Sequence, residues 1–270
     1  MVIKINGYHL KWIAFGLFIF LFKMEIIAQD ENLNNNFLVF SITSTNYLPI
    51  QIKTEGVKLL ESQITPSAEI GISYSRNIIN NWGAEFGVYY SQIGYNIFYN
   101  FYSERFDNPQ EDILNNFNRL TVFDYRSSRL SLKLATFKDF KISNSTNIRF
   151  SSGINVDFCH AESVEGIHSY SNINNKDYNL FRMRLESFVP IDTHASFTGK
   201  IGLVKTFKNN YLTINLVGSY SPSLILNGVY EFSNINFESK GTIKLRPSYF
   251  GIEFNYALAL KKKAPNKTYK

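Results

Sequence analysis

The chain has 270 residues and a formal net charge of +6, and it is 44% hydrophobic, 16% aromatic and 19% charged. Without the lysines and the glutamate of its first 28 residues the charge falls to about +4, an excess too mild to indicate nucleic acid as a partner. Cys159 is the single cysteine, which excludes an intramolecular disulfide. No linker-like segment or change of composition divides the chain, so we expect one domain with a sizeable core.

A secretory signal peptide is predicted over residues 1–28. Lys4 and Lys11 precede an apolar run of about eleven residues, WIAFGLFIFLF, and the small residue Ala28 precedes Gln29. The run is too short to cross a bilayer as a helix, so we expect export and cleavage after Ala28. A retained membrane anchor is the alternative interpretation.

Eight segments then alternate apolar and polar side chains with a period of two, which predicts β-strands. In chain order they are 36–47, 66–78, 82–95, 120–137, 147–160, 193–207, 211–221 and about 246–260. Short turns rich in Asn, Lys and Ser alternate with gaps of about twenty residues or more, near 48–65, 96–119, 161–192 and 222–245. Short turns at one end and long external loops at the other are typical of an outer-membrane barrel. We therefore expect an all-β fold, an antiparallel up-and-down transmembrane barrel of about eight strands.

The fourth segment breaks its own alternation. Phe123 and Tyr125 share one parity, whereas Leu130, Leu132 and Leu134 share the other. A β-bulge at 126–128 would reverse the faces. The alternative is that residues 120–125 belong to the preceding loop.

The two faces of the predicted strands differ in size and charge. One parity is bulky and aromatic, too voluminous for the interior of an eight-stranded barrel, so we expect it to face lipid. The other parity is small and polar with about one charge per strand, and we expect its charges to pair inside the barrel: Glu69, Glu85, Lys133, Arg149, Lys200 and Glu253. Aromatic residues near strand ends are expected at the lipid headgroups: Tyr74, Trp82, Tyr90, Tyr95, Tyr211, Tyr220 and Tyr249. A soluble exported lipocalin-like barrel that binds a ligand is an alternative.

With these features the chain resembles the small outer-membrane β-barrel proteins of Gram-negative bacteria, the porin-like or PorT-like barrels, from about residue 36 to 260. The segment SYFGIEFNY is similar to their C-terminal assembly signal, with Gly251 followed by Phe254 and Tyr256. The resemblance implies outer-membrane localisation, contact with outer-membrane lipid and insertion by the barrel-assembly machinery. The chain departs from the pattern because it continues through Leu260. We expect a barrel domain over 29–260 and a basic periplasmic tail over 261–270.

Three histidines, His160, His168 and His194, fall at the predicted long-loop end. A rim enzyme acting on lipid or peptide would use His194 or His160 as base, Ser196 as nucleophile and Glu162 or Asp192 as orienting acid. None of these spacings is a catalytic or metal-ligand signature, and the sequence contains no nucleotide motif. We therefore expect a protein that is not an enzyme and has no cofactor or metal, with a structural role or a ligand or protein partner bound by its external loops.

Overall fold

The computed structural model describes residues 36–100, 121–160, 162–171, 177–187, 191–207, 210–233 and 239–260. The predicted signal peptide, residues 29–35 and the predicted tail over 261–270 lie outside this part of the chain. Every regular element of the described part is a β-strand. No helix with the length and hydropathy of a membrane span occurs among the described residues.

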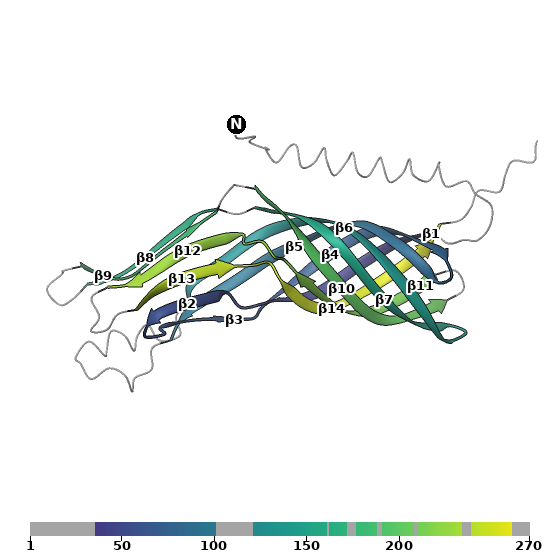
Figure 1. Cartoon of the computed structure of the whole chain (residues 1–270), viewed down its shortest axis with the longest axis horizontal. Coiled ribbons are helices and arrows are strands. Elements are labelled where there is room, and N and C mark those ends of the chain that lie inside the picture. The colour runs from purple at the N-terminus through teal and green to yellow at the C-terminus, as the bar shows by residue number, and fades with distance from the viewer. Residues whose placement is uncertain are drawn as a thin grey trace, which may run out of the picture.

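Eight antiparallel strands form a closed ring (Figure 1). Around the ring they are β1 (Asn36–Tyr47), β4 (Thr65–Ile79), β5 (Trp82–Tyr99), β6 (Thr121–Ser143), β7 (Thr146–His160), β10 (Ile191–Phe207), β11 (Asn210–Tyr220) and β14 (Tyr249–Ala259). The first and last of them pair, and so do β5 and β6, which closes the ring. These are the eight predicted strands with ends shifted by a few residues, so the predicted antiparallel barrel is confirmed.

Tight turns connect neighbouring ring strands at one end. Asn80 and Asn81 link β4 to β5 with φ values of 50° and 67°. Ile79 pairs directly with Trp82 around them. Two consecutive positive φ angles are the signature of a type I′ hairpin, and asparagine tolerates them better than most residues. The β6–β7 turn lies at this same end, which we name the turn end. The first residues of β1 and the last residues of β14 also lie there.

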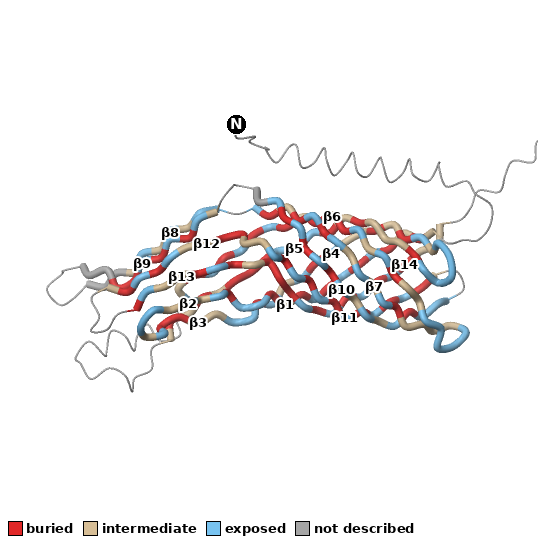
Figure 2. The backbone as a smooth tube through the Cα atoms, viewed as in Figure 1, coloured by how far each residue is buried: buried red, intermediate tan, exposed pale blue. Residues whose placement is uncertain are grey.

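The ring carries a belt of exposed apolar side chains. In Figure 2 buried and exposed residues alternate along the ring strands, as expected when successive side chains point to opposite faces. All eight ring strands contribute to the belt, with Phe40, Ile42, Ile70, Ile78, Trp82, Tyr90, Leu134, Phe140, Phe150, Ile154, Phe197, Ile201, Leu203, Leu212, Ile214, Leu216, Phe250, Ile252 and Phe254. This arrangement is the reverse of a lipocalin-like cup, which would enclose these side chains.

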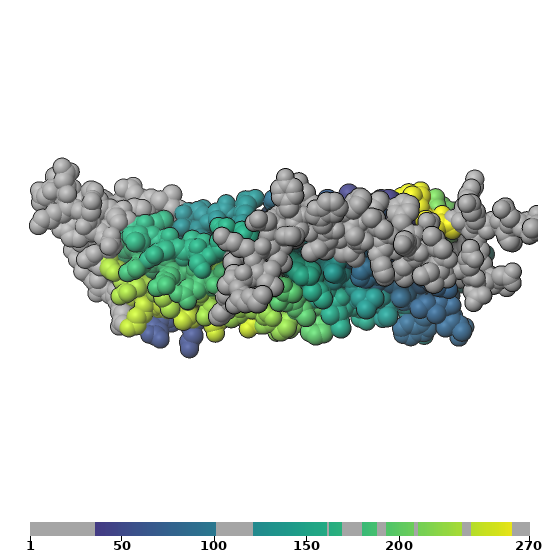
Figure 3. Space-filling view, turned by 90° about the horizontal axis from the view of Figure 1, so that it is seen from above, coloured from purple at the N-terminus to yellow at the C-terminus, as the bar shows by residue number. Residues whose placement is uncertain are grey.

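The opposite end, which we name the outer half, holds a second sheet. It contains β2 (Gln51–Gly56), β13 (Ser239–Leu245), β12 (Leu226–Phe232), β9 (Asp177–Glu186) and β8 (Val164–Ser171), in that order, while β3 (Leu60–Gln63) pairs with β5. Three of the four gaps predicted as loops, 48–65, 161–192 and 222–245, therefore contain strands, and that prediction was wrong for them. Most of the fourth gap lies outside the described residues. Figures 1 and 3 show β12 and β13, in yellow-green, at the end away from the β4–β5 hairpin.

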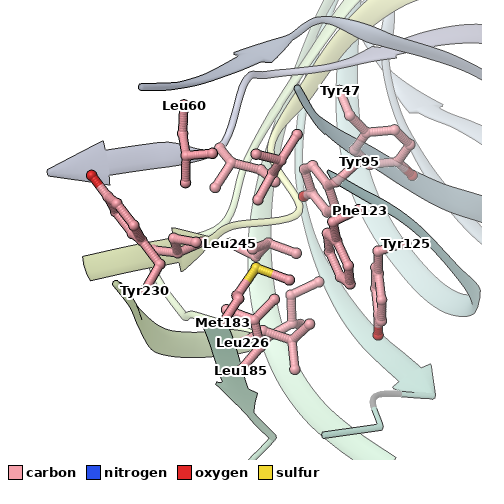
Figure 4. Close-up of a cluster of buried hydrophobic side chains, with 14 of the residues drawn as sticks. Tyr47, Leu60, Tyr95, Phe123, Tyr125, Met183, Leu185, Leu226, Tyr230 and Leu245 are labelled. Carbon is pink, nitrogen blue, oxygen red and sulfur yellow. The ribbon is translucent and has the colours of Figure 1, made fainter. Parts of the chain in front are cut away.

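The outer half encloses an apolar core. Side chains from ring strands and from the second sheet point toward one another there (Figure 4). The buried cluster includes Tyr47, Leu60, Ile93, Tyr95, Ile97, Tyr99, Phe123, Tyr125, Cys159, Phe181, Met183, Leu185, Leu226, Tyr230, Phe232, Ile243 and Leu245. Its rings meet mainly edge-on or tilted, as for Tyr99 and Phe181 with centroids 5.5 Å apart.

The inward face changes character along a strand without any change of register. On β6 the inward residues run from Lys133, Ser131 and Arg129 to the apolar Tyr125 and Phe123. The β5–β6 pairing is continuous from Trp82 to Ile97, so the bulge predicted at 126–128 is absent. The inward residues change from polar to apolar where the outward residues change from apolar to polar. The half of the barrel at the turn end, the turn-end half, is apolar outside, and the outer half is polar outside.

The exposed face of the second sheet carries charged side chains on neighbouring strands. Four residues on neighbouring strands are partners in register and alternate in charge: Glu55, Lys240, Glu231 and Arg182. Such cross-strand pairs are typical of a solvated sheet. The predicted aromatic girdle was wrong for Tyr95, Tyr211 and Tyr249, which point inward and are buried. The side chains of Trp82, Tyr90 and Tyr220 are exposed, and Tyr74 is partly buried.

Candidate functional site: the charged lumen

The ring strands direct their polar parity into the lumen, the space inside the ring. All six charged residues singled out in the sequence lie on this inward face. Glu69, Lys133, Arg149 and Glu253 are buried, and the two remaining residues are partly buried. Because an unpaired charge out of water is costly, the contacts of each decide whether the arrangement is stable.

Glu69 on β4 bridges two cations of β6. Its Oε2 lies 2.7 Å from the Arg129 guanidinium, and its Oε1 accepts a hydrogen bond from Lys133 Nζ. Arg129 also donates to Ser91 Oγ at 3.0 Å and lies 4.8 Å from the centroid of the Tyr249 ring. One carboxylate therefore contacts two neighbouring cations at the level where the lumen meets the apolar core.

Glu253 on β14 forms the second centre. Lys200 Nζ lies 2.9 and 2.8 Å from its two carboxylate oxygens. Asn215 and Asn255 each donate to its Oε1 at 2.8 Å. The carboxylate is thus held by two amides and one ammonium group from three strands.

Glu85 lies nearby without a direct ion pair among the described contacts. It accepts hydrogen bonds from Ser73 at 3.1 Å and from the Tyr89 hydroxyl at 2.8 Å. Lys133 Nζ lies 4.0 Å from the centroid of the Tyr89 ring, which links this group to Glu69. The ring of Tyr89 fills the space left by the inward Gly71, where a Cβ atom would collide with it.

Arg149 on β7 forms a third centre toward the turn end. It donates to both oxygens of Asp139, at 2.7 and 2.8 Å, in the bidentate geometry that guanidinium and carboxylate groups favour. Its guanidinium also lies 3.8 Å from the centroid of the Phe137 ring and donates to the Tyr211 hydroxyl at 3.3 Å.

Asp157 is the centre of a fourth group on the side of the outer half. Ser131 and Ser196 each donate to one of its oxygens at 2.5 Å, and His194 Nε2 lies 3.7 Å from Oδ2. Asn155 links Ser196 to Thr198, at 2.9 and 2.6 Å. The structure thus brings the proposed catalytic pair His194 and Ser196 near an acid, but Ser196 binds that acid directly, and all three side chains are buried.

The remaining residues of the enzyme alternative lie apart from this group. His160 is exposed at the rim, with Nε2 2.9 Å from Glu162. Nδ1 of His168, on β8 of the second sheet, lies 2.8 Å from the hydroxyl oxygen of Tyr99, on β5 of the ring. The side chain of Asp192 lies outside the described part. Among the described residues, no group of three His, Cys, Asp or Glu side chains could hold a metal ion.

Sequence reasoning missed Arg129, Asp139 and Asp157, each of which belongs to a charged centre. Their parity was the available signal: Arg129 and Asp139 share it with Lys133, and Asp157 shares it with Arg149. Arg129 lies next to the reversal expected at 126–128, and Asp139 lies beyond the predicted end of its strand at residue 137.

One cavity inside the lumen is small. A cavity of about 10 Å³ lies among Glu85, Lys133, Asn155 and Lys200. That is enough for about one water molecule. Together with the apolar core above it, this is the filling expected of an eight-stranded barrel.

The three residues of the resemblance to an assembly signal lie on β14, the strand that pairs with both β1 and β11. Gly251 faces inward, where a Cβ atom would collide with the Ser44 backbone, while Phe254 and Tyr256 are exposed in the belt. The structure brings them to the strand that closes the ring.

A ring of eight antiparallel strands with an apolar belt outside and polar side chains inside defines a transmembrane β-barrel of the outer-membrane type. No family model and no curated protein matches the chain.

Solved outer-membrane proteins are among the similar structures. OprG from Pseudomonas aeruginosa is 12% identical, with a TM-score of 0.40, over 84% of this chain and 97% of that chain. A major outer membrane protein from Thermus thermophilus is 9% identical, with a TM-score of 0.39, over 82% and 98%. Neisserial surface protein A is 8% identical, with a TM-score of 0.36, over 83% and 97%. Because these values are low, we base the assignment on the ring, belt and lumen of this chain.

Proposed function

We propose that this protein is a non-enzymatic outer-membrane barrel whose lumen is closed by paired charges, and that it carries the outer half as a structural or binding platform outside the cell. The filled lumen is the observation that supports this most strongly. Four charged centres, with a cavity of about 10 Å³ among Glu85, Lys133 and Lys200, support a bore that leaves little room for solutes. The buried state of His194, Ser196 and Asp157 argues against turnover at the rim.

The proposed orientation places the turn end in the periplasm and the outer half outside the cell. Short periplasmic turns and large external connections are the rule in such barrels. The alternating surface charges of the second sheet suit an aqueous exterior, and its exposed face is where a protein or ligand would bind. Insertion by the barrel-assembly machinery through Gly251, Phe254 and Tyr256 is part of the same proposal.

Cysteine labelling on intact cells tests the orientation. The native Cys159 is fully buried in the core, so it supplies little background. A membrane-impermeant maleimide should label Val229→Cys, on the exposed face of β12, in intact cells. It should label Asn144→Cys, in the β6–β7 turn, only after the outer membrane is opened. The opposite pattern would invert the topology, and recovery of the protein outside the outer-membrane fraction would refute the location.

A further inference from the structure

A groove crosses the outer wall of the barrel over β6, β7, β10 and β11. Its volume is about 830 Å³, and bulky belt residues, among them Phe140, Phe150, Ile201 and Leu216, line it. Four small residues form its floor, and each pairs with the next across the sheet: Thr136, Ser152, Gly199 and Gly218. Nothing of the described chain covers this apolar depression in the belt.

The two floor glycines are not required by the packing of the barrel. A Cβ atom built on Gly199 or on Gly218 would meet no other atom within 4 Å. By contrast, inward glycines such as Gly71 and Gly202 are crowded by neighbouring atoms. The missing side chains at Gly199 and Gly218 therefore leave free space on the lipid side without serving the interior.

Positive charge lies at the turn-end side of this groove. Lys138 lines it, and its Nζ lies 5.0 Å from the Trp82 ring centroid and 5.2 Å from that of Phe140. The row of the floor also extends through Ala84 to the exposed Arg76 on β4. Cations beside an interfacial tryptophan are placed to meet the headgroup level of a bilayer.

We propose that this groove binds one phospholipid of the leaflet at the turn end. An acyl chain lies over the floor between the bulky walls, and the lipid phosphate contacts Lys138. The charge complementarity between a cation and a phosphate, and the continuity of the groove with the lipid-facing belt, select this occupant over a second copy of the chain. The inference rests on the proposed location of the barrel in the outer membrane.

Native mass spectrometry of the full-length mature protein in detergent, titrated with phosphatidylglycerol, tests the inference. The unchanged protein should retain one tightly bound lipid. Gly199→Leu and Gly218→Leu fill the floor without colliding with other atoms of the barrel. Each should weaken lipid retention by about tenfold, as expected when several methylene contacts are lost. Lys138→Gln should weaken it severalfold. Ser44→Leu, an exposed belt substitution on β1, is the matched control and should have no effect.

A phospholipid with a photoreactive acyl chain gives a second readout that needs no variant. Cross-links should fall on peptides that contain residues 136–138, 150–152, 199–201 and 216–218. Equal retention by all variants, or equal loss in the Ser44→Leu control, would overturn the inference. So would a change of oligomeric state without loss of lipid in Gly218→Leu, because the groove would then be an interface between copies. If the protein is recovered as a folded outer-membrane barrel in those cases, the groove inference alone fails.

Discussion

Glu69 shows how a single side chain holds the lumen together. It is the shared partner of Arg129 and Lys133, and all three are buried inside the ring. Removing one member of a buried ionic group is more damaging than replacing the whole group, since the charges left behind cannot reach water.

We therefore expect Glu69→Ala to destabilise the barrel by roughly 3 to 5 kcal/mol. The temperature at which the folded band disappears on a gel of heated samples measures this loss. Glu55→Ala, which removes an exposed carboxylate on β2, should leave that temperature nearly unchanged. Equal effects of the two substitutions would contradict a paired, dry lumen.

We expect His168 to make the outer half sensitive to pH. Partial burial lowers the pKa of His168 from its ordinary value of 6.5. The unfolded chain then binds the proton first as the pH falls, so the stabilisation is present above about pH 6.5 and is lost below it.

Hydrogen exchange of the β8 and β9 amides, corrected for intrinsic rates, should show protection falling between about pH 7 and 5. His168→Phe keeps a ring against Tyr99 and Phe181 but cannot titrate, so it should flatten this dependence. An identical slope in the variant would assign the effect to another group.

Among the elements, the ring strands could be predicted and the second sheet could not. A ring strand alternates between lipid and a polar lumen over nine or more residues, which gives a strong period-two signal. The strands of the second sheet are short, such as Leu226–Phe232 and Ser239–Leu245, and contain glycine within Asn- and Ser-rich surroundings. They form because three long connections meet and bury a common core, which is a tertiary effect that no local pattern records.

The limit of local patterns also explains how much of the charged lumen could be predicted. Parity assigned Glu69, Glu85, Lys133, Arg149, Lys200 and Glu253 to one face, but it could not supply the partner of each or the depth at which the lumen becomes apolar. Tyr125 and Phe123 were read as a reversal of faces because apolar side chains were expected to be outside everywhere. The exposed residues of β6 change from apolar, as at Leu134, to charged, as at Arg126 and Asp124, and the inward chemistry changes with them.

The β4–β5 hairpin depends on its two asparagines. Asn80 and Asn81 both have positive φ. Alanine in that region costs about 1 to 2 kcal/mol per residue, while glycine adopts it freely. Asn80→Ala combined with Asn81→Ala should therefore lower the urea midpoint of unfolding, and Asn81→Gly should preserve or raise it. Asn144→Ala, in the β6–β7 turn, serves as the control; an equal loss there would remove the conformational explanation.

For the whole molecule, the two halves rest on different forces. The turn-end half depends on lipid outside and ion pairs inside, and the outer half depends on an apolar core like that of a soluble domain. Phe181 lies in this core against Tyr99, Tyr230 and Phe232.

Phe181→Ala should destabilise the outer half by about 3 to 5 kcal/mol. Limited proteolysis should then cut within the second sheet, while the ring keeps its resistance to detergent until heated. Val229→Ala, on the exposed face of the same sheet, should do neither. Simultaneous loss of both properties in Phe181→Ala would show that the halves unfold as one unit.

The closed lumen is the central claim, and planar-bilayer recording of the purified protein tests it most directly. Side chains fill an eight-stranded bore, and the apolar core lies across its outer end. We therefore expect no steady single-channel currents, in low or high salt. Large, steady, reproducible conductance steps from the unchanged protein would contradict the account and indicate an open pore.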